Sequence, residues 1–160
     1  MFILLDIDGV MVPAKSWESP PLLSDGMPAF SAMAVSALAQ CITPDTTVIL
    51  TTSHKNRFSV EEWKAIFHAR GLSVPQLKIL AVITAGTRLE ELMPWLNLND
   101  PEQSYVIIDD DKSLHGLPPE HKKNWIATDA MIGLCDHHVE TIQASLKTVW
   151  IPKSRESVSA

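Results

Sequence analysis

Short apolar segments alternate with amphipathic helical segments along most of this chain, and this alternation constrains the fold more than any other feature. A run of about four apolar residues without a polar face is typical of a strand buried on both sides. Strands that alternate with single helices form a parallel sheet covered by helices on both faces. The sequence therefore predicts an α/β fold with a mainly parallel central sheet. The expected strands comprise residues 2–5, 47–50, 79–83, 105–108 and 125–127.

Capping signals and helical spacing locate the helices between these strands. Ser59 and Thr87 each precede a glutamate by three residues, which is the capping-box pattern of a helix N-terminus. Gly71 stands where a glycine commonly follows a helix C-terminus. Four helices are expected, the first over about residues 28–41. Their apolar faces comprise Phe30, Met33, Ala37 and Cys41, then Val60, Trp63, Ile66 and Phe67, then Leu89, Leu92, Met93 and Leu96, then Val139, Ile142, Leu146 and Val149.

Length and composition indicate one folded domain. The chain has 160 residues, of which 46% are hydrophobic and 20% are charged, so it can bury a substantial core. We expect a single domain over residues 1–151 and a flexible polar tail over residues 152–160. No apolar run approaches the ~18 residues of a membrane span, and no basic segment typical of a secretory signal opens the chain. Because two cysteines are too few for a disulfide framework, we expect reduced thiols in a cytoplasmic protein.

Polar side chains of a particular kind follow three of the expected strands. Asp6 and Asp8 follow the first strand, Thr51 the second, and Asp109 and Asp110 the fourth. In a parallel sheet the carboxyl ends of the strands meet at one edge, where ligands bind. Carboxylates crowded at that edge repel one another, and a hard divalent cation with oxygen ligands relieves the repulsion. The sequence therefore predicts a Mg²⁺ site, which also suits a phosphate.

The spacing of the two first acids favours a division of roles between them. Asp6 and Asp8 lie two residues apart, so in an extended strand their side chains leave on the same side, and Gly9 then permits a sharp turn. One carboxylate can bind metal and attack phosphorus, which gives an aspartyl-phosphate. The other can donate a proton to the leaving group and later accept one from water. Thr51 can donate a hydrogen bond to a phosphate oxygen.

These segments resemble the sequence motifs of the haloacid dehalogenase-like (HAD) superfamily of phosphotransferases. Its first motif, a hydrophobic strand followed by D-x-D-G-V/T, is matched by residues 2–10. Its second motif, a strand ending in Thr or Ser, is matched by residues 48–51, with Thr52 as the one-residue alternative. Its fourth motif, a strand ending in an acidic pair, is matched by residues 106–110. The resemblance implies a Rossmann-like three-layer α/β/α fold over nearly the whole chain.

The resemblance also implies roles for the acids. Asp6 would be the nucleophile and a Mg²⁺ ligand. Asp8 would be the general acid and base, with its main-chain carbonyl on the metal. Asp110 would be the principal third ligand, and Asp109 would assist directly or through water. The activity implied is a Mg²⁺-dependent phosphomonoester hydrolase.

The third motif departs from the family pattern. The family places a lysine near the start of the helix before the fourth motif, and this chain has Arg88 there. Arginine keeps the positive charge but is bulkier than lysine and is not a compact point charge. Either Arg88 substitutes for the lysine, or Lys112 or Lys78 reaches the site. Arg88 as a merely exposed helix residue is an equal alternative.

The segments between the motifs leave no room for a separate cap domain, so the chain resembles a capless member of the superfamily. The closest subgroup that it resembles is the small HAD domains associated with RNA-repair proteins. Shared features include D-I-D-G-V at residues 6–10, Trp95-Leu96 in the third helix and Gly133-Leu134 before the last helix. An open site suits a large substrate or a polymer end. A nucleotide or a nucleic-acid end is therefore the expected substrate class.

Three residues after the second motif are weaker candidates for substrate contact. Thr52, His54 and Lys55 lie beside Thr51, although the favoured interpretation of His54 and Lys55 is that of solvated loop residues. The net charge of −6 argues against binding nucleic acid by overall electrostatic attraction, while a local basic patch stays compatible with the sequence. The alternative function is a non-catalytic HAD-like module for binding or regulation. The missing cap and Arg88 favour that alternative.

Two further features invite functional interpretations. Residues 135–138, Cys-Asp-His-His, have the composition of a metal cluster. Successive residues of a helix point ~100° apart, so we expect these side chains to diverge and the histidines to be exposed at a helix start. Trp17 follows the first motif and is a candidate for stacking on a substrate.

Overall fold

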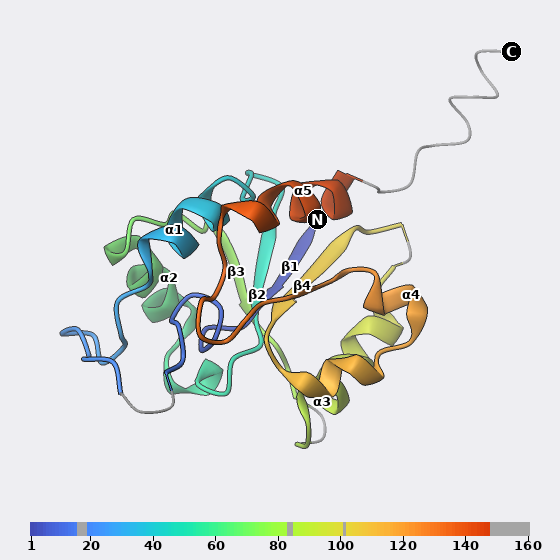
Figure 1. Ribbon diagram of the computed structural model, residues 1–160, viewed down its shortest axis with the longest axis horizontal. Coiled ribbons are helices and arrows are strands. Elements are labelled where there is room, and N and C mark those ends of the chain that lie inside the picture. The colour runs from blue at the N-terminus through green and yellow to red at the C-terminus, as the bar shows by residue number, and fades with distance from the viewer. Residues whose placement is uncertain (16–18, 83–84, 101, 148–160) are drawn as a thin grey trace, which may run out of the picture.

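The computed structural model describes residues 1–15, 19–82, 85–100 and 102–147, and these form one sheet with helices on both faces (Figure 1). The sheet has five strands in the order β3-β2-β1-β4-β5, and every neighbouring pair is parallel. The strands are β1 (Phe2–Leu5), β2 (Thr47–Leu50), β3 (Gln76–Ile79), β4 (Tyr105–Asp109) and β5 (Trp125–Ala127). The predicted α/β class with a parallel sheet is confirmed.

The first strand of the chain lies at the centre of the sheet. Phe2 pairs with Thr47 on one side and with Tyr105 on the other, and the register continues without a bulge to Leu5. Residues Ile3, Leu4 and Leu5 are fully buried. A strand that is hydrogen-bonded on both edges and covered on both faces has to be wholly apolar, which explains the composition of this segment.

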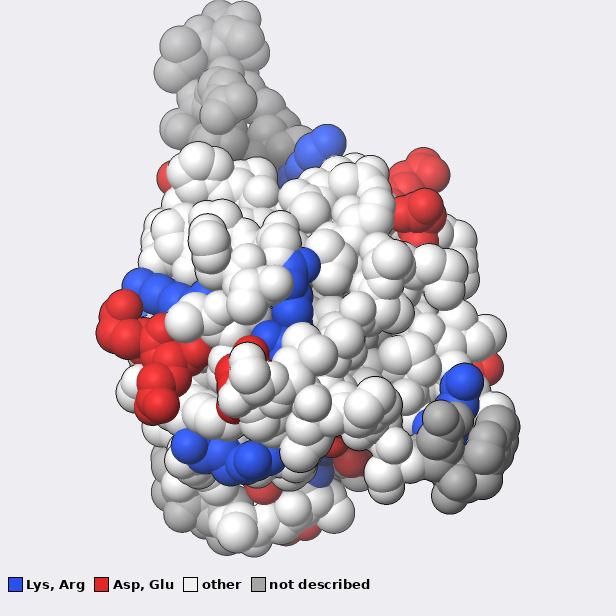
Figure 2. All heavy atoms as spheres, turned by 90° about the vertical axis from the view of Figure 1, so that its left-hand side faces the viewer, with Lys and Arg blue, Asp and Glu red and all other residues white. Residues whose placement is uncertain are grey.

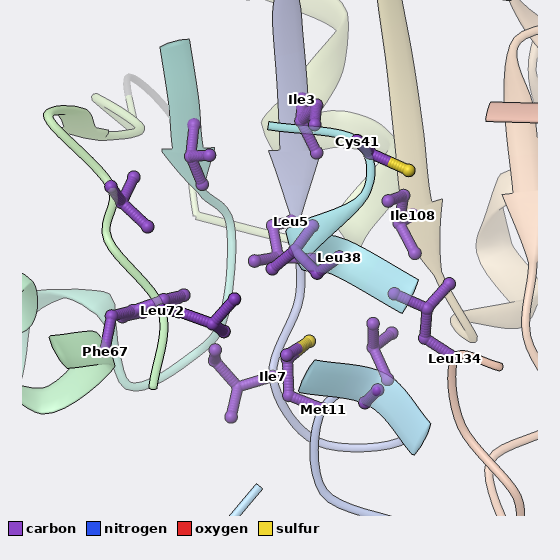
Figure 3. Close-up of a cluster of buried hydrophobic side chains, with 14 of the residues drawn as sticks. Ile3, Leu5, Ile7, Met11, Leu38, Cys41, Phe67, Leu72, Ile108 and Leu134 are labelled. Atoms are coloured by element: carbon purple, nitrogen blue, oxygen red, sulfur yellow. The ribbon is translucent and has the colours of Figure 1, made fainter. Parts of the chain in front are cut away.

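The helices divide between the two faces and make two separate cores. On one face, Ile3, Leu5 and Ile108 pack against α1, α2 and α5 (Figure 3). On the other face, Leu4, Ile49 and Ile107 pack against α3 and the turn that follows β4. This arrangement confirms the predicted three-layer architecture. The helices are α1 (Ala32–Ala39), α2 (Val60–Ala69), α3 (Arg88–Leu98), α4 (Pro119–Lys122) and α5 (Val139–Lys147), with 3₁₀ turns η1 (Lys55–Arg57), η2 (Lys112–Gly116) and η3 (Asp136–His138).

Two predicted elements have other bounds in the structure. The first helix begins at Ala32 rather than near residue 28, because Ser31 is extended and its side chain caps the backbone N–H of Ala34. Met33, expected on the apolar face, is consequently half exposed. The third strand comprises Gln76–Ile79 rather than residues 79–83. It is an edge strand with an alternating pattern of exposure, and the search for a wholly apolar run therefore missed it.

The described residues contain no separate cap domain between the motifs. In its described part, the segment from β1 to β2 contains α1 and loops, and the segment from β2 to β4 contains η1, α2, β3 and α3. Among the described residues, no helix combines the length and the apolar character needed to cross a bilayer. The predicted tail over residues 152–160, Val149 and Trp17 lie outside the described residues.

Two glycines with positive φ offer a test of how tightly the loop before η3 packs against the loop after β1. Gly133 has φ +80°, and a Cβ there would lie 2.5 Å from the carbonyl oxygen of Val10. Gly71 has φ +86°, and a Cβ there would meet no atom within 4 Å beyond its chain neighbours. Gly133→Ala is expected to cost about 2–4 kcal/mol of unfolding free energy and Gly71→Ala about 1 kcal/mol. Urea unfolding of both variants measures the difference. Equal losses would show that the contact with Val10 is not tight.

Candidate active site

The ends of β1, β2 and β4 meet at one edge of the sheet and continue their pairing for one residue beyond the strands. The backbone N–H of Asp6 donates to the carbonyl of Ile108 at 3.1 Å, and that of Thr51 donates to the carbonyl of Leu5 at 2.9 Å. Strand pairing therefore fixes the backbone at Asp6 and Thr51. Asp109 is the last residue of β4. The side chains that follow the strands are held by the sheet itself.

Three carboxylates converge at this edge. Asp6, Asp109 and Asp110 each offer a carboxylate oxygen within 4.8 Å of the others. Asp109 is fully buried and Asp6 nearly so. Gly9 has φ +80°, and a Cβ there would lie 2.3 Å from Oδ2 of Asp110. Glycine at this position therefore allows Asp110 to approach the loop that follows Asp6.

One guanidinium joins the buried acids to the end of β2. Nη1 of Arg88 lies 2.6 Å from Oδ2 of Asp109, 3.3 Å from Oγ1 of Thr51 and 3.5 Å from Oδ1 of Asp6. Thr87 caps α3 directly before Arg88, and the predicted capping box with Glu90 is present. The helix start thus presents the arginine to the sheet edge.

Among the described residues, Arg88 is the cation that forms ion pairs with Asp6 and Asp109. Its side chain is 11% exposed, so the alternative of a merely exposed helix residue is wrong. Among the described residues, no ion pair joins Lys78 or Lys112 to Asp6, Asp109 or Asp110. Lys78 instead lines a separate groove beside Trp95.

The charges of the site are poorly balanced. Burial and the repulsion from Asp109 raise the pKa of Asp6 from 3.8 to about 9, although Arg88 opposes this shift. Burial also raises the pKa of Asp109, again against the effect of Arg88. Burial acts to lower the pKa of Arg88, but the carboxylates of Asp6 and Asp109 outweigh it, and the net pKa is raised. The site accordingly favours additional positive charge.

The donor set fits Mg²⁺. All three grouped donors are carboxylate oxygens, the ligand type that this hard cation prefers. Two of them are buried, and burial raises the pKa of both although one guanidinium faces them. Asp6, Asp109 and Asp110 are therefore the residues of this site that would hold the cation.

Asp8 stands apart from the grouped carboxylates. Its side chain is 50% exposed, and its Oδ2 lies 2.9 Å from Nε2 of His54. His54 directly precedes η1 and is itself one-third exposed. The structure thus places one acid of the D-x-D pair inside the acidic cluster and the other at the surface beside an imidazole.

Most side chains that follow β2 are buried and contact other protein groups rather than solvent. Thr51 and Thr52 are fully buried, and Oγ1 of Thr52 accepts a hydrogen bond from the backbone N–H of His54 at 3.3 Å. Lys55 is also buried, and its Nζ lies 3.6 Å from Glu91 and 3.4 Å from the carbonyl of Thr52. The expectation of a solvated Lys55 is wrong, because this lysine ties η1 to α3.

The sequence interpretation overlooked Thr128. Its Oγ1 donates to the carbonyl of Gly9 at 2.8 Å, and its backbone N–H donates to the carbonyl of Asp109 at 3.3 Å. Thr128 thereby joins the loop of the first motif to the end of β4. It directly follows β5, so the same search for polar residues at strand ends could have found it.

Comparison with known families agrees with this geometry. The model of the family described as "HAD domain in Swiss Army Knife RNA repair proteins" matches residues 2–139, which include every described strand. Searches of curated proteins and of solved structures found no match. The match covers the acidic cluster, Arg88 and Asp8 together. The chain therefore belongs to the HAD domain family of Swiss Army Knife RNA repair proteins.

Proposed function

We propose that this domain is a Mg²⁺-dependent phosphomonoester hydrolase that works through an aspartyl-phosphate. The observation that carries the proposal is the carboxylate of Asp6 at the end of the central strand, grouped with Asp109 and Asp110 and faced by Arg88. Mg²⁺ on these three acids would supply positive charge to the phosphoryl oxygens and lower the repulsion between an anionic ester and the site. Membership of a HAD family supports the same reaction class.

The protein groups suit the two halves of such a reaction. An oxygen of Asp6 forms a bond to phosphorus, and the bond from phosphorus to the leaving oxygen breaks. Asp8, in its protonated form, gives its proton to that leaving oxygen. In the second half, the Asp8 carboxylate accepts a proton from water, whose oxygen attacks phosphorus and releases Asp6. Arg88 supplies fixed positive charge beside the nucleophile throughout.

The exposed position of Asp8 supports its proposed role. A proton donor has to reach the leaving group and later a water molecule, and a carboxylate inside the acidic cluster would do neither. His54, at 2.9 Å, holds one oxygen of Asp8 and so orients the carboxyl group. We therefore assign His54 to positioning Asp8, and we assign Lys55 and Thr52 to holding the loop.

The substrate class proposed is a phosphorylated nucleotide or nucleic-acid end. The family name and the absence of a separate cap in the described residues support a site that a polymer end can enter. Figure 2 shows Lys and Arg in small groups interspersed with Asp and Glu on one face, without a continuous basic surface there. With a net charge of −6, a short terminal contact suits the protein better than binding along a nucleic-acid backbone.

The first experiment measures hydrolysis of p-nitrophenyl phosphate with Mg²⁺ and with EDTA. The proposal requires turnover that depends on Mg²⁺. Oligonucleotides carrying a 5′- or 3′-phosphate, compared with small phosphomonoesters, then test the substrate class. Equal turnover of both groups of substrates would contradict the preference for nucleic-acid ends.

Replacing Asp8 tests the acid–base step separately. Asp8→Asn is expected to lower kcat by ~10²–10⁴-fold with an alkyl phosphate, because the leaving alkoxide needs a proton. The loss with p-nitrophenyl phosphate is expected to be smaller, since nitrophenolate leaves without one. Steady-state kinetics on both substrates measure the difference. An equal loss on the two esters would remove Asp8 from this role.

A non-catalytic binding or regulatory module is the second candidate. The contact of Arg88 with Asp109 at 2.6 Å favours it, since the family's usual lysine is replaced by a larger group that also faces Asp6. Mg²⁺ binding without hydrolysis of any ester in a broad panel would support this alternative against the phosphatase.

A further inference from the structure

A second group of potential metal ligands lies outside the acidic cluster, at the start of α5. Cys135, His137 and His138 offer ligand atoms that all lie within 4.8 Å of one another. The expectation that these side chains diverge is wrong. Cys135 is extended, with φ −149° and ψ 174°, and only the following residues form the turn η3. As an N-cap residue, Cys135 directs its side chain back over that turn, where the two imidazoles lie.

The distances within this group are close to those of a tetrahedral metal site. Sγ of Cys135 lies 3.0 Å from Nδ1 of His137 and 3.6 Å from Nδ1 of His138. A zinc ion with Zn–S of about 2.3 Å and Zn–N of about 2.0 Å separates a sulfur from a nitrogen ligand by about 3.5 Å. The ring centroids of the two histidines are 4.0 Å apart. The two separations between sulfur and nitrogen thus lie on either side of the value expected for zinc ligands.

We propose that Cys135, His137 and His138 bind Zn²⁺ and leave its fourth position to water or to an external ligand. One thiolate and two imidazoles are donors that this borderline-soft ion prefers, unlike the all-carboxylate group at the sheet edge. The thiol is buried, whereas His137 is exposed and admits the ion from solvent. Binding transfers the thiol proton to solvent.

Backbone contacts give this site a structural role. Leu134, next to Cys135, donates its backbone N–H to the carbonyl of Val10 at 2.8 Å. The backbone N–H of Cys135 donates to Nδ1 of His138 at 3.1 Å and so turns that ring toward the thiol; an ion bound through Nδ1 would replace this hydrogen bond. Zinc would thus fix the start of α5 beside the loop that follows the D-x-D pair.

Titration with Co²⁺ tests the site without reference to phosphatase activity. A cobalt–thiolate bond gives a charge-transfer absorption in the near ultraviolet, which carboxylate ligands do not give. We expect one equivalent of this chromophore in the full chain, and competition by Zn²⁺. Zn²⁺ at about a hundredfold excess over its Kd is expected to raise the midpoint of thermal unfolding by about 5 °C or more.

The variants separate this site from other thiols and imidazoles. Cys135→Ser and His137→Gln are expected to lose the chromophore and the rise in the unfolding midpoint, and His137 is exposed, so its replacement leaves the fold intact. The controls are Cys41→Ser, whose thiol points into the core (Figure 3), and His68→Gln on the exposed side of α2, and both should keep the chromophore. Absence of the absorption in wild type, or its persistence in Cys135→Ser, would overturn the proposal.

Discussion

Asp6→Asn is expected to lower phosphatase activity by about 10³-fold or more, because an amide cannot form the aspartyl-phosphate. The same substitution is expected to make the metal-free protein more stable at neutral pH. The carboxylate of Asp6 is buried beside Asp109, so its charge is costly in the absence of Mg²⁺, even with Arg88 nearby. One substitution should therefore move activity and stability in opposite directions, which a merely structural residue would not do.

The sign of the stability effect follows from the proton count. The pKa of Asp6 is raised in the folded protein to about 9 from 3.8, so the folded state binds more protons than the unfolded state between these values. The contribution of Asp6 to stability consequently falls as the pH rises from about 4 to about 9. Asp6→Asn removes this contribution. In EDTA, the gain in unfolding midpoint over wild type is expected to grow from about pH 5 to about pH 8.

A matched control comes from the other acid of the pair. Asp8 is half exposed, so Asp8→Asn should not reproduce the pH-dependent gain. Saturating Mg²⁺ should stabilise wild type and reduce the advantage of Asp6→Asn. If Asp6→Asn destabilised the metal-free protein at every pH, the burial of an uncompensated carboxylate would be the wrong description of this site.

Arg88→Met is expected to lower both activity and stability strongly. It removes the guanidinium from Asp109 and Asp6, whose side chains are 0% and 7% exposed. Breaking a buried pair from one side costs about 3–5 kcal/mol, and loss of fixed positive charge at a reacting group costs about 10²–10³-fold in kcat. Arg88→Lys restores the charge and the family's usual residue, and it is expected to recover most of the rate.

A second buried arginine provides the control for stability alone. Arg70 pairs with Asp25 through two nitrogens, at 2.6 and 2.9 Å, and lies after α2, outside the site. Arg70→Met should lower the unfolding midpoint while kcat of the folded fraction stays near that of wild type. Wild-type turnover by Arg88→Met would show that the arginine has no part in the reaction.

The sequence predicted most accurately the interior strands of the sheet, which are buried on both faces. Strands β1, β2 and β4 have neighbours on both edges, so their segments are almost wholly apolar and were located within one residue. The edge strand β3 alternates in exposure, and short turns such as η2 have no periodicity, so neither was located correctly. Both depend on contacts made only in the folded chain.

The candidate site was predictable to a similar extent. The rule that strand ends meet at one edge predicted that Asp6, Asp8, Thr51, Asp109 and Asp110 converge. The structure groups Asp6, Asp109 and Asp110 and joins Thr51 to them through Arg88, but it places the side chain of Asp8 at the surface. The pairing of His54 with Asp8 and the burial of Lys55 depend on how a loop folds over α3, which residue types alone do not specify. The convergence of Cys135 with His137 depends on one extended residue before a turn.

The central position of β1 has a consequence for how the domain assembles its candidate active site. Phe2 pairs with Tyr105, a partner about two-thirds of the chain away, so the middle of the sheet closes only after a large loop is ordered. Topologies with such distant pairings have a high contact order and fold slowly. A chain still emerging from the ribosome, ended at Leu98, would have Asp6 but neither Asp109 nor Asp110. The grouping of Asp6 with Asp109 and Asp110 should therefore form late in refolding, together with native packing rather than with early secondary structure.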